Sequence, residues 1–416
     1  MMKILVITHS IPSPFQSDTS PVLYLIKNLS NMYKHQVTVV SFVSHDMDSR
    51  DCDAMGELGL LSGTVPFPLK HNVHTGVFSY KEILYMLRNN VRHIARNAKL
   101  GLFINLLDCY YSSEMRDLIT NLVTYKRFDA IITTRPMVNY VLDMKIPTFI
   151  YPLDAVYFWH KQNYIKSTRM QKLLTGLLYI LTKEYEKRIY PYIDACLVVT
   201  EEDKQLLEEL NPIIKCNVLP CGIDTDYFRP DAEVGEDEAS LVFVSGMSSY
   251  PSKVNVLSFY RNTFPLIRNE IPSVQLYLVG RDPIREIIDL GRDPNVIVTG
   301  FVDDVRPYLA KASVIIAPLV LGTGIKLKVL EAMAMGKPVV TTSVGIQGIV
   351  GVNGRDCIVS DDPHEYACHV VKLLKDPGLR ATLGRNARSN MERIYSWTRI
   401  AGNFNDIMLR TLTQYN

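Results

Sequence analysis

Short runs of apolar and β-branched residues recur along the chain, separated by stretches long enough to form a helix. The first half has such runs at residues 3–9, 36–42, 129–134, 147–152 and 194–200, and the second half at 241–246, 274–280, 296–301, 313–318, 337–342 and 357–360. Several runs of the second half end in Gly or Pro, as strand-to-helix turns do. Strands that alternate with helices predict parallel sheets, so we expect an α/β protein with two doubly wound, Rossmann-like domains.

Between the two sets of runs, residues 217–239 lose all periodicity because of prolines, glycines and an acidic run. This composition is typical of an interdomain linker. We predict a first domain of residues 1–221, a second of residues 222–395, and a C-terminal helix, 396–416, that packs back on the first. Ligands of open parallel sheets bind at the carboxyl ends of the strands, so we expect the two domains to face each other across a cleft.

Composition agrees with two globular domains and excludes several classes of protein. A chain of 416 residues with 47% hydrophobic residues can fill two cores. The 45 basic and 43 acidic residues leave a net charge of only +2, which gives no general attraction for nucleic acid. Seven scattered cysteines without a CxxC pair predict neither a disulfide scaffold nor a zinc site. With no signal peptide or membrane-spanning run expected, we predict a cytoplasmic protein.

The most informative segment is residues 313–342, which predicts a strand, a Gly-rich loop, a helix and a second strand. Gly322 and Gly324 allow the backbone to approach a ligand closely. The free amides and the dipole of the following helix point to the same place, so a phosphate group fits there. Lys326 and Lys328 add positive charge for a diphosphate, and because they diverge around the helix we expect one to dominate.

Glu331 follows Lys328 by about one helical turn, on the same face of the predicted helix. A carboxylate in that place can accept hydrogen bonds from both hydroxyls of a ribose. The alternative is purely structural: the glycines only make a turn, the lysines are solvated, and Glu331 pairs with Lys328.

Residues 330–340, LEAMAMGKPVV, resemble the retaining glycosyltransferases of family 4, which have the GT-B fold, and the resemblance covers nearly the whole chain. It implies that Glu331 binds the donor's ribose. It also implies that a basic side chain and the backbone of the preceding loop bind the diphosphate: Gly322, Thr323, Gly324 and Ile325. Many members have a glutamate for the transferred hexose where this chain has Thr323. The sequence GTGIKLK matches a subgroup with Gly-x-Gly-x-basic-x-Lys in that place.

Two further segments of the second half are similar to donor-binding segments of that family. The turn at 245–253 implies that Gly246 and Lys253 lie near the phosphates, whereas on spacing alone Lys253 is an ordinary solvated lysine. The segment 298–314 implies backbone contacts to the nucleobase from Gly300, Phe301 and Val302. Without the resemblance, Phe301 would be assigned to the core.

On the acceptor side, the loop after residues 3–9 lacks the glycines that the family has there, and His9, Ser17 and Asp18 are the candidate cleft residues. A lone histidine after a strand is also a common structural residue. Asp154 matches an acidic residue that the family places near the reacting sugar. The alternative is that Asp154 caps the next helix.

Two stretches predict basic amphipathic helices, residues 80–107 and 166–188. Such helices can lie on anionic lipid, which would place the protein on the inner face of the cell membrane and present the cleft to a lipid-linked acceptor. The alternative is that both are ordinary helices with one solvated face.

These observations predict a retaining glycosyltransferase that moves a hexose from a nucleotide-diphosphate sugar to a glycan or lipid-linked acceptor, in the synthesis of cell-surface polysaccharide or glycoconjugates. Lys326, Lys328, Glu331 and Asp154 are the expected catalytic residues. No cofactor or metal is expected, because the lysines and helix amides take the place of a cation. Residues 220–224 resemble the family's hinge pattern Pro-Asn-Gly-Val-Asp, with Cys221 in place of the asparagine. Two alternatives stay open: a catalytically silent subunit of a glycan-assembly complex, motivated by Thr323, Cys221 and the missing N-terminal glycines, and a nucleotide-sugar epimerase of similar shape.

Overall fold

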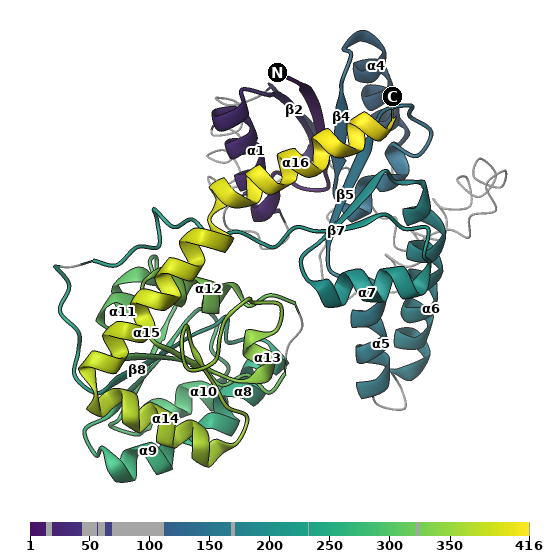
Figure 1. Ribbon diagram of the computed structural model, residues 1–416. Coiled ribbons are helices and arrows are strands. Elements are labelled where there is room, and N and C mark those ends of the chain that lie inside the picture. The colour runs from purple at the N-terminus through teal and green to yellow at the C-terminus, as the bar shows by residue number, and fades with distance from the viewer. Residues whose placement is uncertain are drawn as a thin grey trace. The chain divides into compact units, whose positions relative to one another are not determined.

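The computed structural model describes residues 1–13, 19–43, 56, 63–68, 112–167, 171–231, 233–321 and 324–415. The chain divides into two compact units (Figure 1): Met1–Pro220 with Ala401–Asn416, and Cys221–Ile400. The division therefore lies one residue before the boundary that the sequence predicts, and most of the C-terminal helix belongs to the first unit. How the two units face each other stays a prediction.

The first unit is built on a parallel sheet of seven strands in the order β3-β2-β1-β4-β5-β6-β7. Its strands are β1 Lys3–Thr8, β2 Gln36–Val43, β3 Gly63–Pro68, β4 Ala130–Thr133, β5 Thr148–Leu153, β6 Ala195–Val198 and β7 Cys216–Val218. The five strands expected from the sequence are confirmed. The sequence does not predict β3 and β7, the two edge strands.

The first unit has helices between its strands, and some of these helices begin at a side-chain cap. The helices are α1 Ser20–Tyr33, α4 Ser113–Tyr125, η2 Arg135–Tyr140, α5 Val156–Lys166, α6 Lys172–Ile189, η3 Tyr190–Tyr192 and α7 Glu201–Leu210. Thr200, for example, caps α7 by accepting the N–H of Asp203. The last helix, α16 Trp397–Tyr415, adds Phe404, whose ring meets Phe149 edge-on at 5.6 Å between ring centroids. This contact fixes the end of the chain to the sheet of the first unit.

The second unit contains a six-stranded parallel sheet in the order β10-β9-β8-β11-β12-β13. Its strands are β8 Ser240–Val244, β9 Gln275–Val279, β10 Val296–Gly300, β11 Val314–Ala317, β12 Val339–Thr341 and β13 Ile358–Val359. All six are predicted from the sequence, because strands covered on both faces form continuous apolar runs. The predicted class, two doubly wound parallel sheets, is confirmed.

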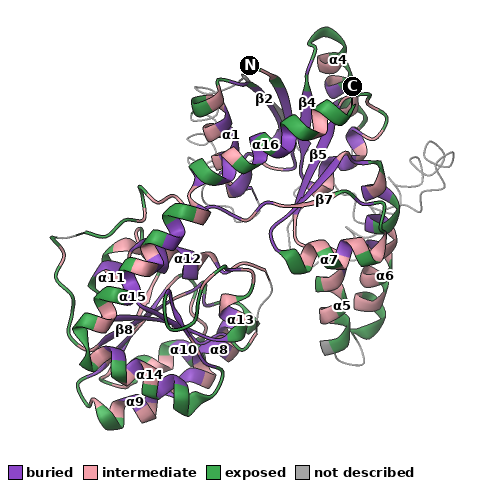
Figure 2. Cartoon of the chain, viewed as in Figure 1, coloured by how far each residue is buried: buried purple, intermediate pink, exposed green. Residues whose placement is uncertain are grey.

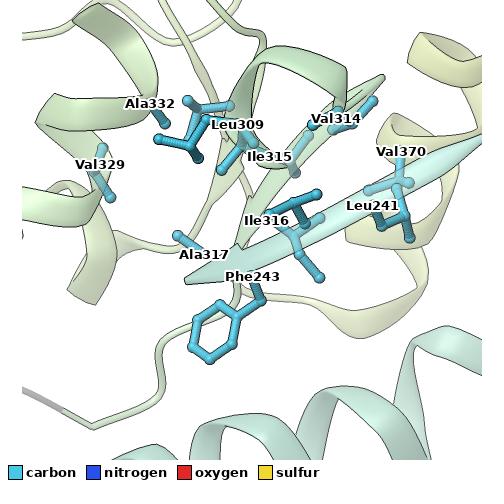
Figure 3. Close-up of a cluster of buried hydrophobic side chains, with 14 of the residues drawn as sticks. Leu241, Phe243, Leu309, Val314, Ile315, Ile316, Ala317, Val329, Ala332 and Val370 are labelled. Carbon is cyan, nitrogen blue, oxygen red and sulfur yellow. The ribbon is translucent and has the colours of Figure 1, made fainter. Parts of the chain in front are cut away.

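Helices cover the second sheet and supply its core. They are α8 Tyr250–Asn262, α9 Phe264–Glu270, α10 Arg285–Ile288, η4 Asp289–Arg292, α11 Arg306–Lys311, α12 Leu327–Ala334, α13 Ser343–Ile346, α14 Pro363–Lys375, α15 Pro377–Asn390 and the π-helical turn η5 Met391–Tyr395. Figure 3 shows side chains of α12 and α14 around the fully apolar strand β11. Val329 and Ala332 of α12 are completely buried there, so the core fixes the position of this helix.

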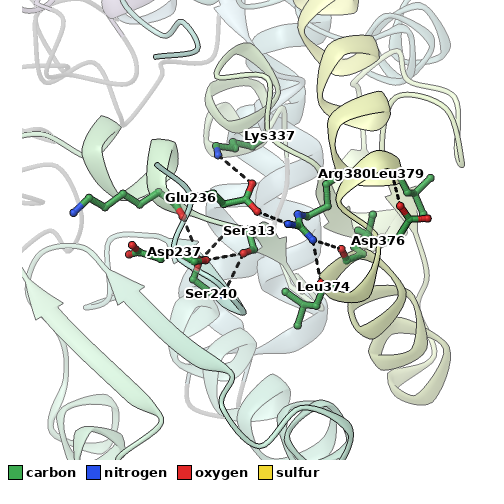
Figure 4. Close-up of polar contacts among 11 residues, drawn as sticks. Glu236, Asp237, Ser240, Ser313, Lys337, Leu374, Asp376, Leu379 and Arg380 are labelled. Carbon is green, nitrogen blue, oxygen red and sulfur yellow. Dashed lines mark hydrogen bonds and ion pairs between the residues drawn. The ribbon is translucent and has the colours of Figure 1, made fainter. Parts of the chain in front are cut away.

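The segment predicted to be a linker is attached to the second unit from Cys221 onward. Figure 4 shows Glu236 between Lys337 and Arg380, at 3.8 and 2.6 Å. Arg388 of α15 donates to the carbonyls of Phe228 and Ala334, at 2.6 and 2.7 Å, and so ties the same segment to the end of α12. One residue of the acidic run, Glu236, thus forms ion pairs with the turn after α12 and with α15.

Candidate functional site

In the second unit, the strand order reverses between β8 and β11. Ligands of doubly wound sheets bind at the carboxyl ends of the strands beside such a reversal. β8 ends at Val244 and β11 ends at Ala317, so the loops that follow these two strands flank the expected position. They are the loops in which the sequence predicts phosphate-binding glycines, Gly246 and Gly324.

The loop after β11 leads directly into the amino end of α12. Gly324 has a φ of 67°, a left-handed conformation that favours glycine. Lys326 is the N-cap residue, and its carbonyl accepts the N–H groups of Val329 and Leu330 at 2.8 and 3.3 Å. The amides of the first helical turn are then directed out of the helix, toward the end where an anion is favoured. Gly322 and Thr323 lie outside the described residues.

The two lysines of this turn diverge, as expected. Lys326 is 8% exposed, and its amine turns back to donate to the carbonyl of Gly324. Lys328 extends across the strand reversal, where its Nζ donates to Ser245 Oγ at 2.9 Å and lies 5.3 Å from the centre of the Phe243 ring. Lys328 is therefore the lysine that joins the loops after β8 and β11.

Lys328 and Glu331 have strongly perturbed electrostatics. Burial lowers the pKa of the Lys328 amine to about 8, although the nearby Glu331 carboxylate acts in the opposite direction. Burial raises the pKa of Glu331 to about 7, against the effect of Lys328. Among the described residues no hydrogen bond or ion pair holds the Glu331 carboxylate, so the purely structural alternative, in which Glu331 pairs with Lys328, lacks the close contact it requires. Groups perturbed in this way are concentrated at functional sites.

Sequence reasoning missed the residues that hold the two loops together. Asn255 of α8 accepts the N–H groups of Val320 and Leu321 at 2.9 and 3.1 Å and donates to the Leu321 carbonyl at 3.2 Å. Thr342, after β12, donates to the Leu319 carbonyl at 2.6 Å. A signal for Asn255 exists in the sequence, because it shares the buried helical face of α8 with Val256.

The loop after β8 is also held by close backbone packing. Gly280, at the end of β9, has a φ of 151°, and a Cβ built on it would lie 1.7 Å from the Ser245 carbonyl oxygen. Gly246 faces open space, since nothing lies within 4 Å of where its Cβ would be. A glycine is thus required at position 280 by packing, and Gly246 leaves room for a ligand.

The other donor-side candidates are more dispersed. Lys253 of α8 forms an ion pair with Glu286, so it is not simply a solvated lysine. Phe301 is 69% exposed after the end of β10, which makes the alternative assignment to the core wrong. Gly300 has a φ of 68° and faces open space, while Val302 and Ile325 are partly buried against the core.

In the first unit the strand order reverses between β1 and β4, and His9 lies at this point. Its Nδ1 is 3.2 Å from Thr134 Oγ1, across the reversal. Asp154 follows Leu153, whose φ of 71° is rare for a residue with a side chain. The N-cap of α5 is Ala155, so Asp154 does not serve as its cap. Ser17 and Asp18 lie outside the described residues.

A buried ionic cluster near Asp154 was not predicted from the sequence. Glu186 of α6 has no exposed surface, accepts the N–H of Tyr157 at 3.3 Å and lies 3.6 Å from Arg135 Nε. Burial raises the pKa of Glu186 to about 7, against the effect of Arg135. The Tyr190 hydroxyl is also buried and lacks a hydrogen bond among the described residues. The cluster ties α5 and α6 to the loop after β4.

The described residues lack two features that could bear on function. None of their helices is both long enough and apolar enough to cross a lipid bilayer. Within those residues, no three His, Cys, Asp or Glu side chains are grouped so that they could hold a metal ion. That transfer proceeds without a metal stays a prediction.

Part of the second unit matches a known protein family. Residues 238–376 match the family described as Glycosyl transferases group 1. An uncharacterized glycosyltransferase of Methanocaldococcus jannaschii is 31% identical over 184 residues, which cover 42% of this chain and 45% of that protein. The chain therefore aligns with less than half of this relative's length. The match to glycosyl transferases group 1 lies within the second unit.

Solved structures match over the whole chain. Sucrose-phosphate synthase from Thermosynechococcus elongatus has a TM-score of 0.66 at 18% identity, with all of both chains covered. Anabaena HepE, in complex with UDP and glucose, has a TM-score of 0.65 at 13% identity and covers 99% of this chain and 100% of its own. At these identities the similarity shows the fold alone, and the predicted GT-B fold is confirmed. Membership of the retaining family 4 stays a prediction.

Proposed function

We propose that this protein is a glycosyltransferase that uses a nucleotide-diphosphate sugar as donor. One observation carries the proposal: Lys328, in the first turn of α12, donates to Ser245 across the strand reversal, and Glu331 lies about one turn further along the same helix, within the segment that matches glycosyl transferases group 1. That place combines backbone amides, a partly buried ammonium and a carboxylate that no other described residue holds by a hydrogen bond or ion pair. Phosphates and a ribose are the groups that need this combination.

In the proposed complex, the diphosphate binds at the amides that open α12 and at the Lys328 amine. Lys328 already spans the loops after β8 and β11, so the phosphates would displace or join the Ser245 hydroxyl at the amine. The Glu331 carboxylate, one turn deeper, accepts the ribose hydroxyls. The UDP bound to HepE makes a uridine nucleotide the first donor to test.

In the proposed reaction, the bond between the sugar's anomeric carbon and the β-phosphate oxygen breaks. A bond from the acceptor's hydroxyl oxygen to the same carbon forms, the hydroxyl proton passes to the leaving phosphate, and a nucleoside diphosphate is released. Lys328 and the helix amides stabilise the negative charge that develops on the departing phosphate. We propose retention at the anomeric carbon, with the acceptor bound by the first unit near His9 and Asp154.

The acceptor is proposed to be a glycan or a lipid-linked sugar, in the synthesis of polysaccharide or glycoconjugate. The strand reversal in the first unit places His9 and Thr134 together where a ligand of such a sheet is expected. Leu153, just before Asp154, has a left-handed backbone conformation. We propose that His9, Thr134 and Asp154 orient an acceptor hydroxyl.

The experiment is a donor screen followed by a transfer assay on the full chain. Uridine, guanosine and adenosine diphosphate sugars are compared by thermal shift, since a bound ligand raises the melting temperature. Release of nucleoside diphosphate is then measured with and without sugar acceptors, for the wild type, Lys328→Ala and, as a matched control, Lys372→Ala on the exposed side of α14. The proposal requires that the wild type and Lys372→Ala release nucleoside diphosphate and that Lys328→Ala does not. Donor binding without any release would instead indicate the catalytically silent subunit.

A further inference from the structure

Helices α5 and α6 of the first unit pack against each other as an antiparallel hairpin. They lie side by side and project beyond the sheet (Figure 1). The rings of Tyr164 and Tyr179 stack at 6.4 Å between centroids and 15° between planes. Gly176 permits this approach, because a Cβ there would lie 3.1 Å from the Tyr164 ring. The hairpin is therefore a fixed structural element on which a surface can be built.

The outer half of the hairpin exposes apolar side chains, whereas its base is buried (Figure 2). At the base, Glu186 and Ile189 of α6 are inside the protein. Leu173, at the start of α6, is 87% exposed. The exposed apolar residues, called here the hairpin tip, are Ile165, Leu173, Leu174, Leu177 and Ile180. In α6 they recur at helical spacing and form one face, which is the pattern of a docking surface and not of scattered exposure.

Basic residues outnumber acidic ones along the hairpin, and the nearby Glu184 of α6 is already paired with Arg188. Residues 155–183 contain five basic side chains and no acidic one: Lys161, Lys166, Arg169, Lys172 and Lys183. The amines of Lys161, Lys172 and Lys183 lie 5.8, 5.9 and 5.9 Å from the ring centres of Phe158, Tyr164 and Tyr179. In the part of the chain that the structure describes, none of these three lysines forms an ion pair. Their charge is available to an external partner.

We propose that the hairpin tip docks on the surface of an anionic lipid bilayer. A partner for this surface must be both apolar and negatively charged. Residues 69–111, outside the described residues, are apolar but carry six basic side chains against two acidic ones, and residues 44–57 carry five acidic side chains but few apolar ones. A second copy of the chain would bring lysine against lysine. A bilayer with acidic headgroups offers hydrocarbon for the tip and anions for the lysines.

The test is co-sedimentation of the purified full chain with vesicles, without any nucleotide-sugar, so that it is independent of the proposed function. One vesicle contains equal parts phosphatidylcholine and phosphatidylglycerol, and the other contains phosphatidylcholine alone. The tip variant is Leu173→Ser with Leu177→Ser and Ile180→Ser. The matched control replaces exposed aliphatic residues elsewhere: Ile213→Ser, Ile288→Ser and Val350→Ser. A charge variant combines Lys161→Gln, Lys172→Gln and Lys183→Gln.

We expect the wild type and the control to sediment with the anionic vesicle only, and less so at high salt. The tip variant should lose roughly tenfold or more in apparent lipid affinity, and the charge variant about fivefold for each lysine replaced. The proposal is overturned if the wild type stays in the supernatant, if the tip variant binds like the control, or if light scattering shows a dimer that only the tip variant dissociates. The proposal is also overturned if the wild type does not bind lipid and the tip variant melts well below the control. Another segment of the chain would then cover the tip.

Discussion

Replacing Lys328 with methionine should stabilise the protein while it weakens the binding of a diphosphate at α12. The amine is confined beside Phe243, Ser245 and Glu331, and burial lowers its pKa from 10.5 to about 8. Since one pKa unit corresponds to about 1.4 kcal/mol, holding this charge in the folded state costs roughly 3 kcal/mol.

The sign follows from the direction of the pKa change. At pH 7 the amine is protonated in the folded and the unfolded protein, so the full cost applies, and it fades as the pH rises from about 8 to 10.5. Methionine keeps the apolar stem over Phe243 and carries no charge. It loses the hydrogen bond to Ser245, worth about 1 kcal/mol, and leaves Glu331 without a cation. The expected net gain is about 1 to 2 kcal/mol.

Scanning calorimetry measures this gain as a rise of roughly 2 to 8 °C in the melting temperature of the second unit. Isothermal titration with nucleoside diphosphate should show affinity about 10- to 100-fold weaker, because a charge-assisted hydrogen bond to phosphate is lost. Lys372→Met, on the exposed side of α14, is the control and should change neither quantity. A variant that is less stable than the wild type, or that binds the nucleotide equally well, would refute this reasoning.

Three further predictions concern the same site. Glu331→Ala should abolish transfer and leave the circular dichroism spectrum unchanged; normal turnover would remove Glu331 from the site. Nucleoside diphosphate affinity should fall by about tenfold per pH unit above the Lys328 pKa of about 8, because the phosphates bind the protonated amine. Lys328→Arg should remove this decline, and a decline that persists would assign it to another group. Gly280→Ala should lower stability by more than about 2 kcal/mol, since its Cβ would clash with the Ser245 carbonyl. Gly235→Ala, where the Cβ meets nothing within 4 Å, is the control, and equal melting temperatures would contradict the packing argument.

The central strands of both sheets could be predicted from the sequence because burial on both faces requires continuous apolar runs. The two strands that were missed lie at sheet edges, where this requirement is absent. β3 contains Pro66 and Pro68, which an edge strand tolerates and which argue against a strand in the sequence. β7 has only three residues, all partly buried. Edge strands depend on their neighbour for pairing, so their own sequence carries little signal.

The local part of the candidate site was also predictable. Gly324, Lys328 and Glu331 lie within a few residues of one another, and helix geometry relates them directly. The contacts across the strand reversal were not predictable, because the order of strands decides them. Ser245 and Lys328 are 83 residues apart, and Asn255 and Leu321 are 66 apart. Arg135 and Glu186 come together for the same reason in the first unit.

The central claim is that the first turn of α12 binds the diphosphate of an activated sugar. A crystal structure of the full chain with uridine diphosphate glucose tests it most directly. We predict phosphate oxygens within hydrogen-bond distance of the Lys328 amine and the Leu327 and Lys328 amides, and ribose hydroxyls on the Glu331 carboxylate. Clear density for the nucleotide elsewhere in the protein, with Lys328 still bound to Ser245, would contradict the claim.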